Sequence, residues 1–118
     1  LHHYNMILYN TTFIFDAGAD PGVFLDWARH RYIPAALSSP GIESHLLALI
    51  DNPAAEGTRS YALQLVMADE AAAALWDGTA DELRSALEAA YGKGRVVWFS
   101  TFMDIISRSQ SDPTLEAR

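Results

Sequence analysis

The chain of 118 residues contains no cysteine. This absence excludes a disulfide framework, thiolate catalysis and cysteine-ligated zinc, and it is typical of proteins from a reducing cytoplasm. Basic residues are also few, because eight Lys and Arg stand against 15 Asp and Glu and leave a net charge of −7. The basic residues are scattered along the chain, so binding to nucleic acid or to an anionic membrane surface is disfavoured.

Long apolar runs are missing as well. No run approaches the roughly 20 residues that a membrane-spanning helix needs, and the first residues do not have the pattern of a secretory leader. We therefore expect a cytoplasmic protein. No P-loop, dinucleotide-binding glycine loop or nucleophile elbow occurs, and the histidines lack metal-ligand spacing, so no cofactor and no metal are expected.

Half of the residues are hydrophobic, which is enough for one domain of this length to bury a core. We expect that domain to span residues 6–106. Because His2 and His3 precede Met6, residues 1–5 are interpreted as a purification tag or upstream residues. The polar segment 107–118 is expected to be a frayed tail.

Alternating apolar residues and helix-cap signals predict a β-α-β-β-α-β order. Asp20 and Pro21 have the pattern of a helix start, and Pro34 is expected to bend or end the helix that follows. A second helix is expected to start at Asp69 and to break at Asp77-Gly78, before a capping box at residues 79–82. The expected elements are strand 6–15, helix 21–37, strand 42–51, a hairpin loop at 52–57, strand 59–68, a helix from 69 with a second piece at 80–91, and strand 95–106.

This order predicts an α+β, ferredoxin-like fold, in which two helices cover one face of a four-stranded antiparallel sheet in the order 4-1-3-2. The last strand carries large apolar side chains on both of its faces. Because the helices cover only one face, we expect the other face to pack on a second copy and form a dimeric α+β barrel. The alternative is an outer face that exposes some apolar atoms to water, as most protein surfaces do.

Several short pieces of the chain, taken with their order and spacing, form a recognisable pattern. They are Met6–Thr12, Trp27, Tyr32-Ile33-Pro34, Leu37, Leu83-Arg84 and Tyr91-Gly92. On these pieces the chain resembles a small, mainly bacterial family of uncharacterised proteins in the dimeric α+β-barrel, antibiotic-biosynthesis-monooxygenase-like superfamily. The family has a histidine where this chain has Tyr32, while His30 lies two positions earlier.

Candidate site residues follow from the helices. His30 and Tyr32 are candidates for acid–base catalysis, although a helix histidine is more often solvated and a helix tyrosine more often packed in the core. Trp27, Tyr32 and Arg84 are candidate ligand-binding residues; Arg84 can hold a carboxylate or form an ordinary ion pair with Glu88.

Two functions remain open at this point. The first is a homodimeric protein without an assignable activity that binds a small apolar molecule. The second, which the superfamily resemblance implies, is a cofactor-independent oxygenase or isomerase acting on a small aromatic or lactone substrate. A pocket of about 300 Å³ or more that His30 or Tyr32 faces would favour the second function.

Overall fold

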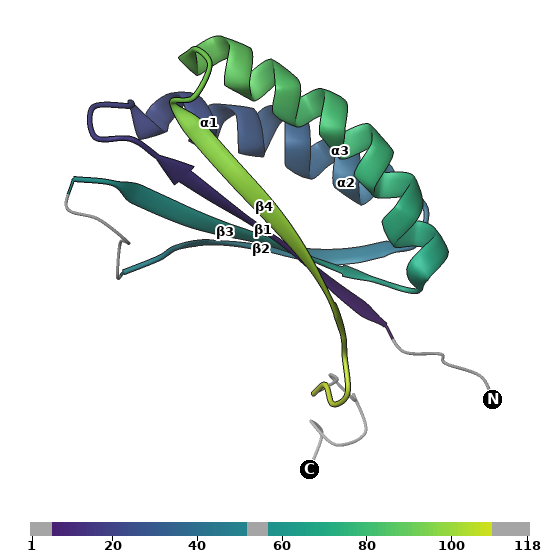
Figure 1. Ribbon diagram of the computed structural model, residues 1–118. Coiled ribbons are helices and arrows are strands. Elements are labelled where there is room, and N and C mark those ends of the chain that lie inside the picture. The colour runs from purple at the N-terminus through teal and green to yellow at the C-terminus, as the bar shows by residue number, and fades with distance from the viewer. Residues whose placement is uncertain (1–5, 52–56, 110–118) are drawn as a thin grey trace.

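A layer of helices covers one face of a four-stranded antiparallel sheet in the computed structural model, which describes residues 6–51 and 57–109 (Figure 1). The expectations for residues 1–5, for the loop at 52–56 and for the tail from residue 110 lie outside the described residues. The sheet has the order β2-β3-β1-β4, as predicted. Its strands are β1 (Ile7–Phe15), β2 (Ile42–Leu49), β3 (Arg59–Met67) and β4 (Val96–Asp104).

Strand β1 lies in the middle of the sheet and pairs with both β3 and β4. On its inner face, which the helices cover, Tyr9 and Phe13 are completely buried. Tyr9 lies opposite Leu65 of β3 and Phe102 of β4. This register follows from the alternation of β1, because a slip of one residue would turn its aromatic side chains away from the helices.

The first helical segment consists of α1 (Pro21–Trp27), a π-helical turn (Ala28–Tyr32) and α2 (Ile33–Ser38). The Asp20 side chain accepts a hydrogen bond from the backbone N–H of Gly22, which confirms the predicted cap. Pro34 does not end the segment. The wider turn just before it leaves room for the proline ring, which would otherwise meet the carbonyl of His30 one turn earlier.

The second helix, α3, runs without a break from Glu70 to Tyr91, so the predicted interruption at Asp77-Gly78 is wrong. The start was predicted correctly, because the Asp69 side chain caps the N–H of Ala72. Local signals favoured a break, but tertiary contacts override them. Buried side chains on both sides of Gly78 pack on the sheet along one face of an uninterrupted helix; they are Ala72, Ala73, Trp76, Ala80, Arg84 and Leu87.

The face of the sheet opposite the helices, here called the outer face, carries exposed apolar side chains. Phe99 of β4 is 54% exposed, although its neighbours on the same strand, Trp98 and Ser100, point to the inner face. The exposed apolar residues of the outer face are Leu46, Val97, Phe99 and Met103. Both faces of β4 are therefore apolar, as the sequence predicts.

Within residues 6–51 and 57–109, no helix is both long enough and apolar enough to cross a membrane.

Substitutions at two glycines test how α3 is built: Gly78 lies within the helix, and Gly41 packs against Ala72 near its start. A Cβ at Gly78 would have no atom within 4 Å, whereas a Cβ at Gly41, which has φ +84°, would lie 2.6 Å from the Cβ of Ala72. In an unbroken helix, Gly78→Ala should stabilise the fold by about 0.5–1 kcal/mol. Gly41→Ala should destabilise it by roughly 1–3 kcal/mol, through steric overlap and backbone strain.

Chemical denaturation of both variants and of the wild-type protein measures these changes. A loss of stability in Gly78→Ala would contradict the continuous helix and restore the predicted break.

Candidate functional site

An open pocket of about 520 Å³ lies on the inner face between the start of α3 and the end of β4. Phe102 points to the helix side of β4 but is 51% exposed, since α3 does not cover this part of the strand. Between Glu70 and Asp77, α3 contributes the small side chains of Ala73 and Ala74 to the wall, so the space stays open. The lining residues are Ile7, Glu70, Ala73, Ala74, Asp77, Phe102 and Asp104.

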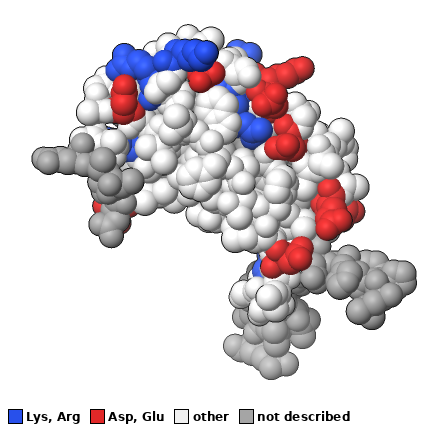
Figure 2. All heavy atoms as spheres, viewed as in Figure 1, with Lys and Arg blue, Asp and Glu red and all other residues white. Residues whose placement is uncertain are grey.

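Charge is unevenly distributed around the molecule. In Figure 2, red acidic side chains border the side where α3 begins and β4 ends, while blue basic side chains gather mainly at the end where α3 finishes. Three of the seven lining residues are acidic and none is basic. The pocket therefore joins an apolar wall to a negative rim.

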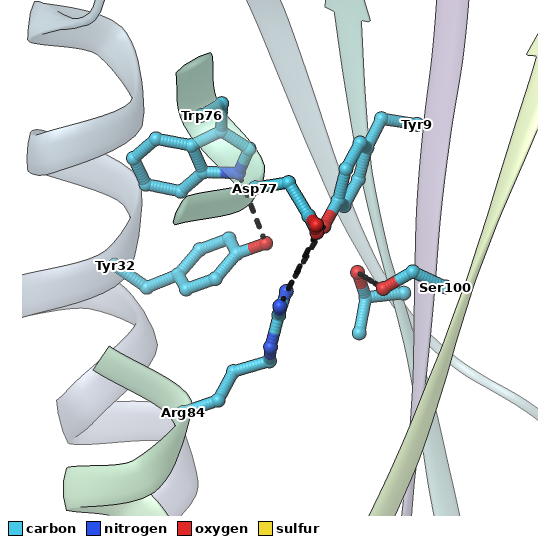
Figure 3. Close-up of polar contacts among 7 residues, drawn as sticks. Tyr9, Tyr32, Trp76, Asp77, Arg84 and Ser100 are labelled. Atoms are coloured by element: carbon cyan, nitrogen blue, oxygen red, sulfur yellow. Dashed lines mark hydrogen bonds and ion pairs between the residues drawn. The ribbon is translucent and has the colours of Figure 1, made fainter. Parts of the chain in front are cut away.

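The carboxylate of Asp77 is held in place by two neighbours behind the pocket wall (Figure 3). The Tyr9 hydroxyl donates to Asp77 Oδ1 at 2.5 Å, and Arg84 donates from Nη1 to the Tyr9 oxygen at 3.0 Å. Arg84 Nη2 lies 3.4 Å from the same Oδ1. Asp77 and Arg84 are seven residues apart, about two helical turns, so both can reach Tyr9 from α3 only if the helix continues through Gly78.

Further polar groups lie deeper in the core. The indole N–H of Trp76 donates to the Tyr32 hydroxyl at 3.4 Å, and the hydroxyls of Thr11 and Ser100 lie 2.8 Å apart. Arg84 is only 5% exposed, and its Nε has no hydrogen-bond partner among the described residues. The network is thus anchored in the core and reaches solvent at Asp77, whose side chain is half-exposed.

Burial controls the ionisation of these groups. Desolvation raises the pKa of Tyr9, and its hydrogen bond to Asp77 raises that pKa further, although contacts with Ser100 and Arg84 oppose the change. Desolvation likewise raises the pKa of Tyr32. Burial alone would lower the pKa of Arg84, but its interactions with Tyr9, Tyr32 and Asp77 outweigh that effect and raise it. Near neutral pH both tyrosines are therefore neutral, and Arg84 is charged.

The residues selected from the sequence lie in different places. His30 is exposed on the π-helical turn, whereas Tyr32 is completely buried. Trp27 packs in the core and donates its indole N–H to the backbone oxygen of Leu83 at 3.0 Å. None of the three lines the pocket. Their catalytic and ligand-binding roles stay predictions.

Arg84 does hold a carboxylate, but it belongs to Asp77 of the same chain. Among the described residues, Glu88, the partner considered from the sequence, forms no ion pair with Arg84. Sequence reasoning missed Asp77, Phe102 and Asp104 as neighbours. The strand alternation that places Tyr9 and Phe102 on one face was a usable signal, but their pairing depends on the register of the sheet.

The acidic residues do not form a metal centre. Across the part of the chain that the structure describes, no group of three or more His, Asp or Glu residues is placed to hold a metal ion.

A family model described as a domain of unknown function (DUF4286) matches residues 6–106. The chain belongs to this family. The resemblance noted in the sequence is thereby confirmed, and three residues of its short pieces, Tyr9, Tyr32 and Arg84, meet in the polar core of this DUF4286 chain. No curated protein matches the chain.

Solved structures share the fold. A monooxygenase from Streptomyces coelicolor (gene ActVA-Orf6), crystallised in complex with nanaomycin D, has a TM-score of 0.65 and 17% identity, over 92% of this chain and 95% of that chain. SnoaB from Streptomyces nogalater, a cofactor-independent oxygenase, has a TM-score of 0.62 and 16% identity, over 92% and 98%. A dimeric ferredoxin-like protein from an uncultured marine organism has a TM-score of 0.65 and 10% identity, over 89% and 99%. These likenesses confirm the ferredoxin-like fold.

The raised tyrosine pKa values predict a loss of stability in alkali. A folded-state pKa above the ordinary value of 10.0 means that the folded protein holds the proton more tightly than the unfolded chain. The resulting contribution is complete below about pH 10 and is lost as the pH rises through the folded-state pKa. The double variant Tyr9→Phe/Tyr32→Phe should be less stable at neutral pH, but its stability should fall less steeply above about pH 10.

Unfolding midpoints measured from neutral pH to about pH 11 compare the two proteins. An equally steep alkaline fall in the double variant would show that these hydroxyls do not carry the effect.

Proposed function

We propose that this chain is a homodimeric α+β-barrel protein that binds a small, mainly apolar molecule in the pocket between α3 and the β1–β4 edge. The observation that carries the proposal is the open space of about 520 Å³ on the inner face. Ligand pockets in proteins typically have volumes of about 300–1,000 Å³, mostly apolar walls and a few polar groups in fixed positions.

The lining of the pocket has this composition. Ile7, Ala73 and Ala74 supply apolar surface, and the half-exposed ring of Phe102 offers a face or an edge for an aromatic ligand. That ring is held in place because it packs edge-on against Tyr9, with ring centroids 4.7 Å apart. Asp77 is fixed by Tyr9 and Arg84, so a bound molecule meets a polar group whose orientation is already set.

The nanaomycin D complex of the Streptomyces coelicolor neighbour supports ligand binding by this fold. Because the identity is 17%, the likeness supports the type of module and says nothing about which molecule binds to this chain.

Self-association follows from the outer face. Its apolar residues Leu46, Val97, Phe99 and Met103 are partly exposed, so each would gain a part of the roughly 1.5–3 kcal/mol that full burial of such a side chain provides. Asn10 lies on the same face, and its side-chain oxygen is buried without a hydrogen-bond partner among the described residues. A second sheet packed face to face would cover the apolar residues and bring polar groups to Asn10. The dimeric ferredoxin-like neighbour supports this arrangement.

A charge on the outer face should prevent dimerisation. We expect the wild-type protein to have twice the mass of one chain in light scattering, and Phe99→Glu to have the mass of one chain, because dimerisation would bury the carboxylate in an apolar interface. Leu75→Glu is the matched control, since Leu75 is 55% exposed but lies on α3, on the opposite side of the sheet. A wild-type protein that remains monomeric at high concentration would contradict the homodimer.

Filling the pocket should prevent ligand binding. Ala74 lines the pocket, and Ala86 is an exposed alanine of the same helix outside it. We expect a neutral aromatic probe, naphthylmethanol, to shift the amide NMR signals of residues 73, 74 and 102. Ala74→Trp should weaken binding by about tenfold or more because the indole occupies the space, while Ala86→Trp should leave it unchanged. Shifts confined to another surface would contradict the pocket assignment.

A cofactor-independent oxygenase or isomerase is the second candidate. The specific observation in its favour is the half-exposed Asp77 carboxylate on the pocket wall, which is positioned to accept a proton from a bound molecule. The cofactor-independent oxygenase among the neighbours adds support at the level of the fold. Oxygen uptake with an aromatic phenol that is abolished in Asp77→Asn, while binding persists, would favour this function over binding alone.

A further inference from the structure

The charges around the pocket indicate which ligands it accepts. Its acidic residues come from two elements that face each other: Glu70 and Asp77 from α3, and Asp104 from the end of β4. No Lys, Arg or His is among the lining residues. An anionic ligand would enter a space bordered by charges of its own sign, which is unfavourable.

The three carboxylates are not equivalent. The charge of Asp77 is balanced by Arg84 and its position is fixed by the Tyr9 hydroxyl. The carboxylates of Glu70 and Asp104, by contrast, have no hydrogen bond or ion pair with any other described residue. Glu70 lies in the first turn of α3. Two negative charges at the rim are therefore left without a partner.

The rest of the lining excludes a bare metal ion as the natural partner of these charges. Much of the wall is apolar, and a half-exposed aromatic ring, that of Phe102, lies in it. An aromatic face attracts an organic cation and also packs against an apolar body. In addition, no three acidic residues or histidines of the described chain converge as metal ligands.

We infer that the pocket selects a protonated amine with an aromatic or other apolar body, the ammonium group lying near Glu70 and Asp104 and the body packing on Ala73, Ala74 and Phe102. This inference rests on the proposed binding function and adds the charge class of the ligand. Three features carry it together: the open volume, the half-exposed aromatic ring, and the unpaired carboxylates of α3 and β4.

Three probes of similar shape and different charge test the inference: naphthylmethylamine, naphthylmethanol and naphthoate. Their affinities are measured by calorimetry at neutral pH and low salt. We expect the amine to bind about tenfold more tightly than the alcohol, because two weakly screened carboxylates attract the ammonium group. Naphthoate should bind more weakly than the alcohol. The preference for the amine should shrink at high salt, where exposed charges are screened.

Removing the two unpaired charges should abolish the preference. In the double variant Glu70→Gln/Asp104→Asn, the affinities for the amine and the alcohol should become equal. The control is Asp26→Asn/Asp81→Asn, which removes the same net charge from exposed positions outside the pocket and should keep the preference. Asp104→Asn alone should lose part of it without changing α3.

Each result bears on a different proposal. Equal affinities for amine and alcohol in the wild-type protein, tighter binding of naphthoate, or a full amine preference in the double variant would overturn the inference and leave the binding function standing. If none of the three probes binds, the proposed binding function falls and the inference falls with it.

Discussion

The contact of Tyr9 with Asp77 and Arg84 is the interaction on which the architecture of the site depends. It joins the middle strand of the sheet to the middle of the long helix, and it requires both partners to project from one face of α3. The Tyr9 hydroxyl is both a donor and an acceptor, since it donates to the Asp77 carboxylate and accepts from the Arg84 guanidinium. Because Arg84 is almost completely buried, the loss of the Asp77 carboxylate would leave its charge in the core without a balancing charge. The network therefore holds the middle of α3 against β1, while Phe102 near the end of β4 stays half-exposed.

Much of the fold could be predicted from local signals. Asp20 and Asp69 cap helices through hydrogen bonds within a few residues, and the alternation of β1 and β4 identifies their inner and outer faces without knowledge of the rest. The prediction failed at Asp77 and Gly78. There the local pattern is typical of a helix end, but the carboxylate is used in a contact with a residue 68 positions away. The local sequence around Asp77 does not reveal a contact with a residue so far away in the chain.

The same limit applies to the site. His30 and Tyr32 were selected from the sequence because their side chains can take part in acid–base chemistry. In the structure His30 is exposed to solvent and Tyr32 is buried in the core, and neither lines the pocket. Phe102 and Asp104 belong to β4, the strand whose two apolar faces were used to predict a dimer interface. Their neighbours across the pocket are alanines, which have no chemistry of their own to draw attention. What makes the site is the space that small side chains leave, and only the packing of α3 against the sheet defines it.

The alanines at the start of α3 have one more consequence. An alanine side chain consists of Cβ alone and has no rotamers. At Ala73 and Ala74 the width of the pocket opening is therefore set by the path of the α3 backbone. Under the proposed binding function, a ligand would lie between the backbone of α3 at Ala73 and Ala74 and the aromatic ring of Phe102. A longer side chain at Ala74 would narrow the opening directly, because this residue is exposed and lies outside the buried core.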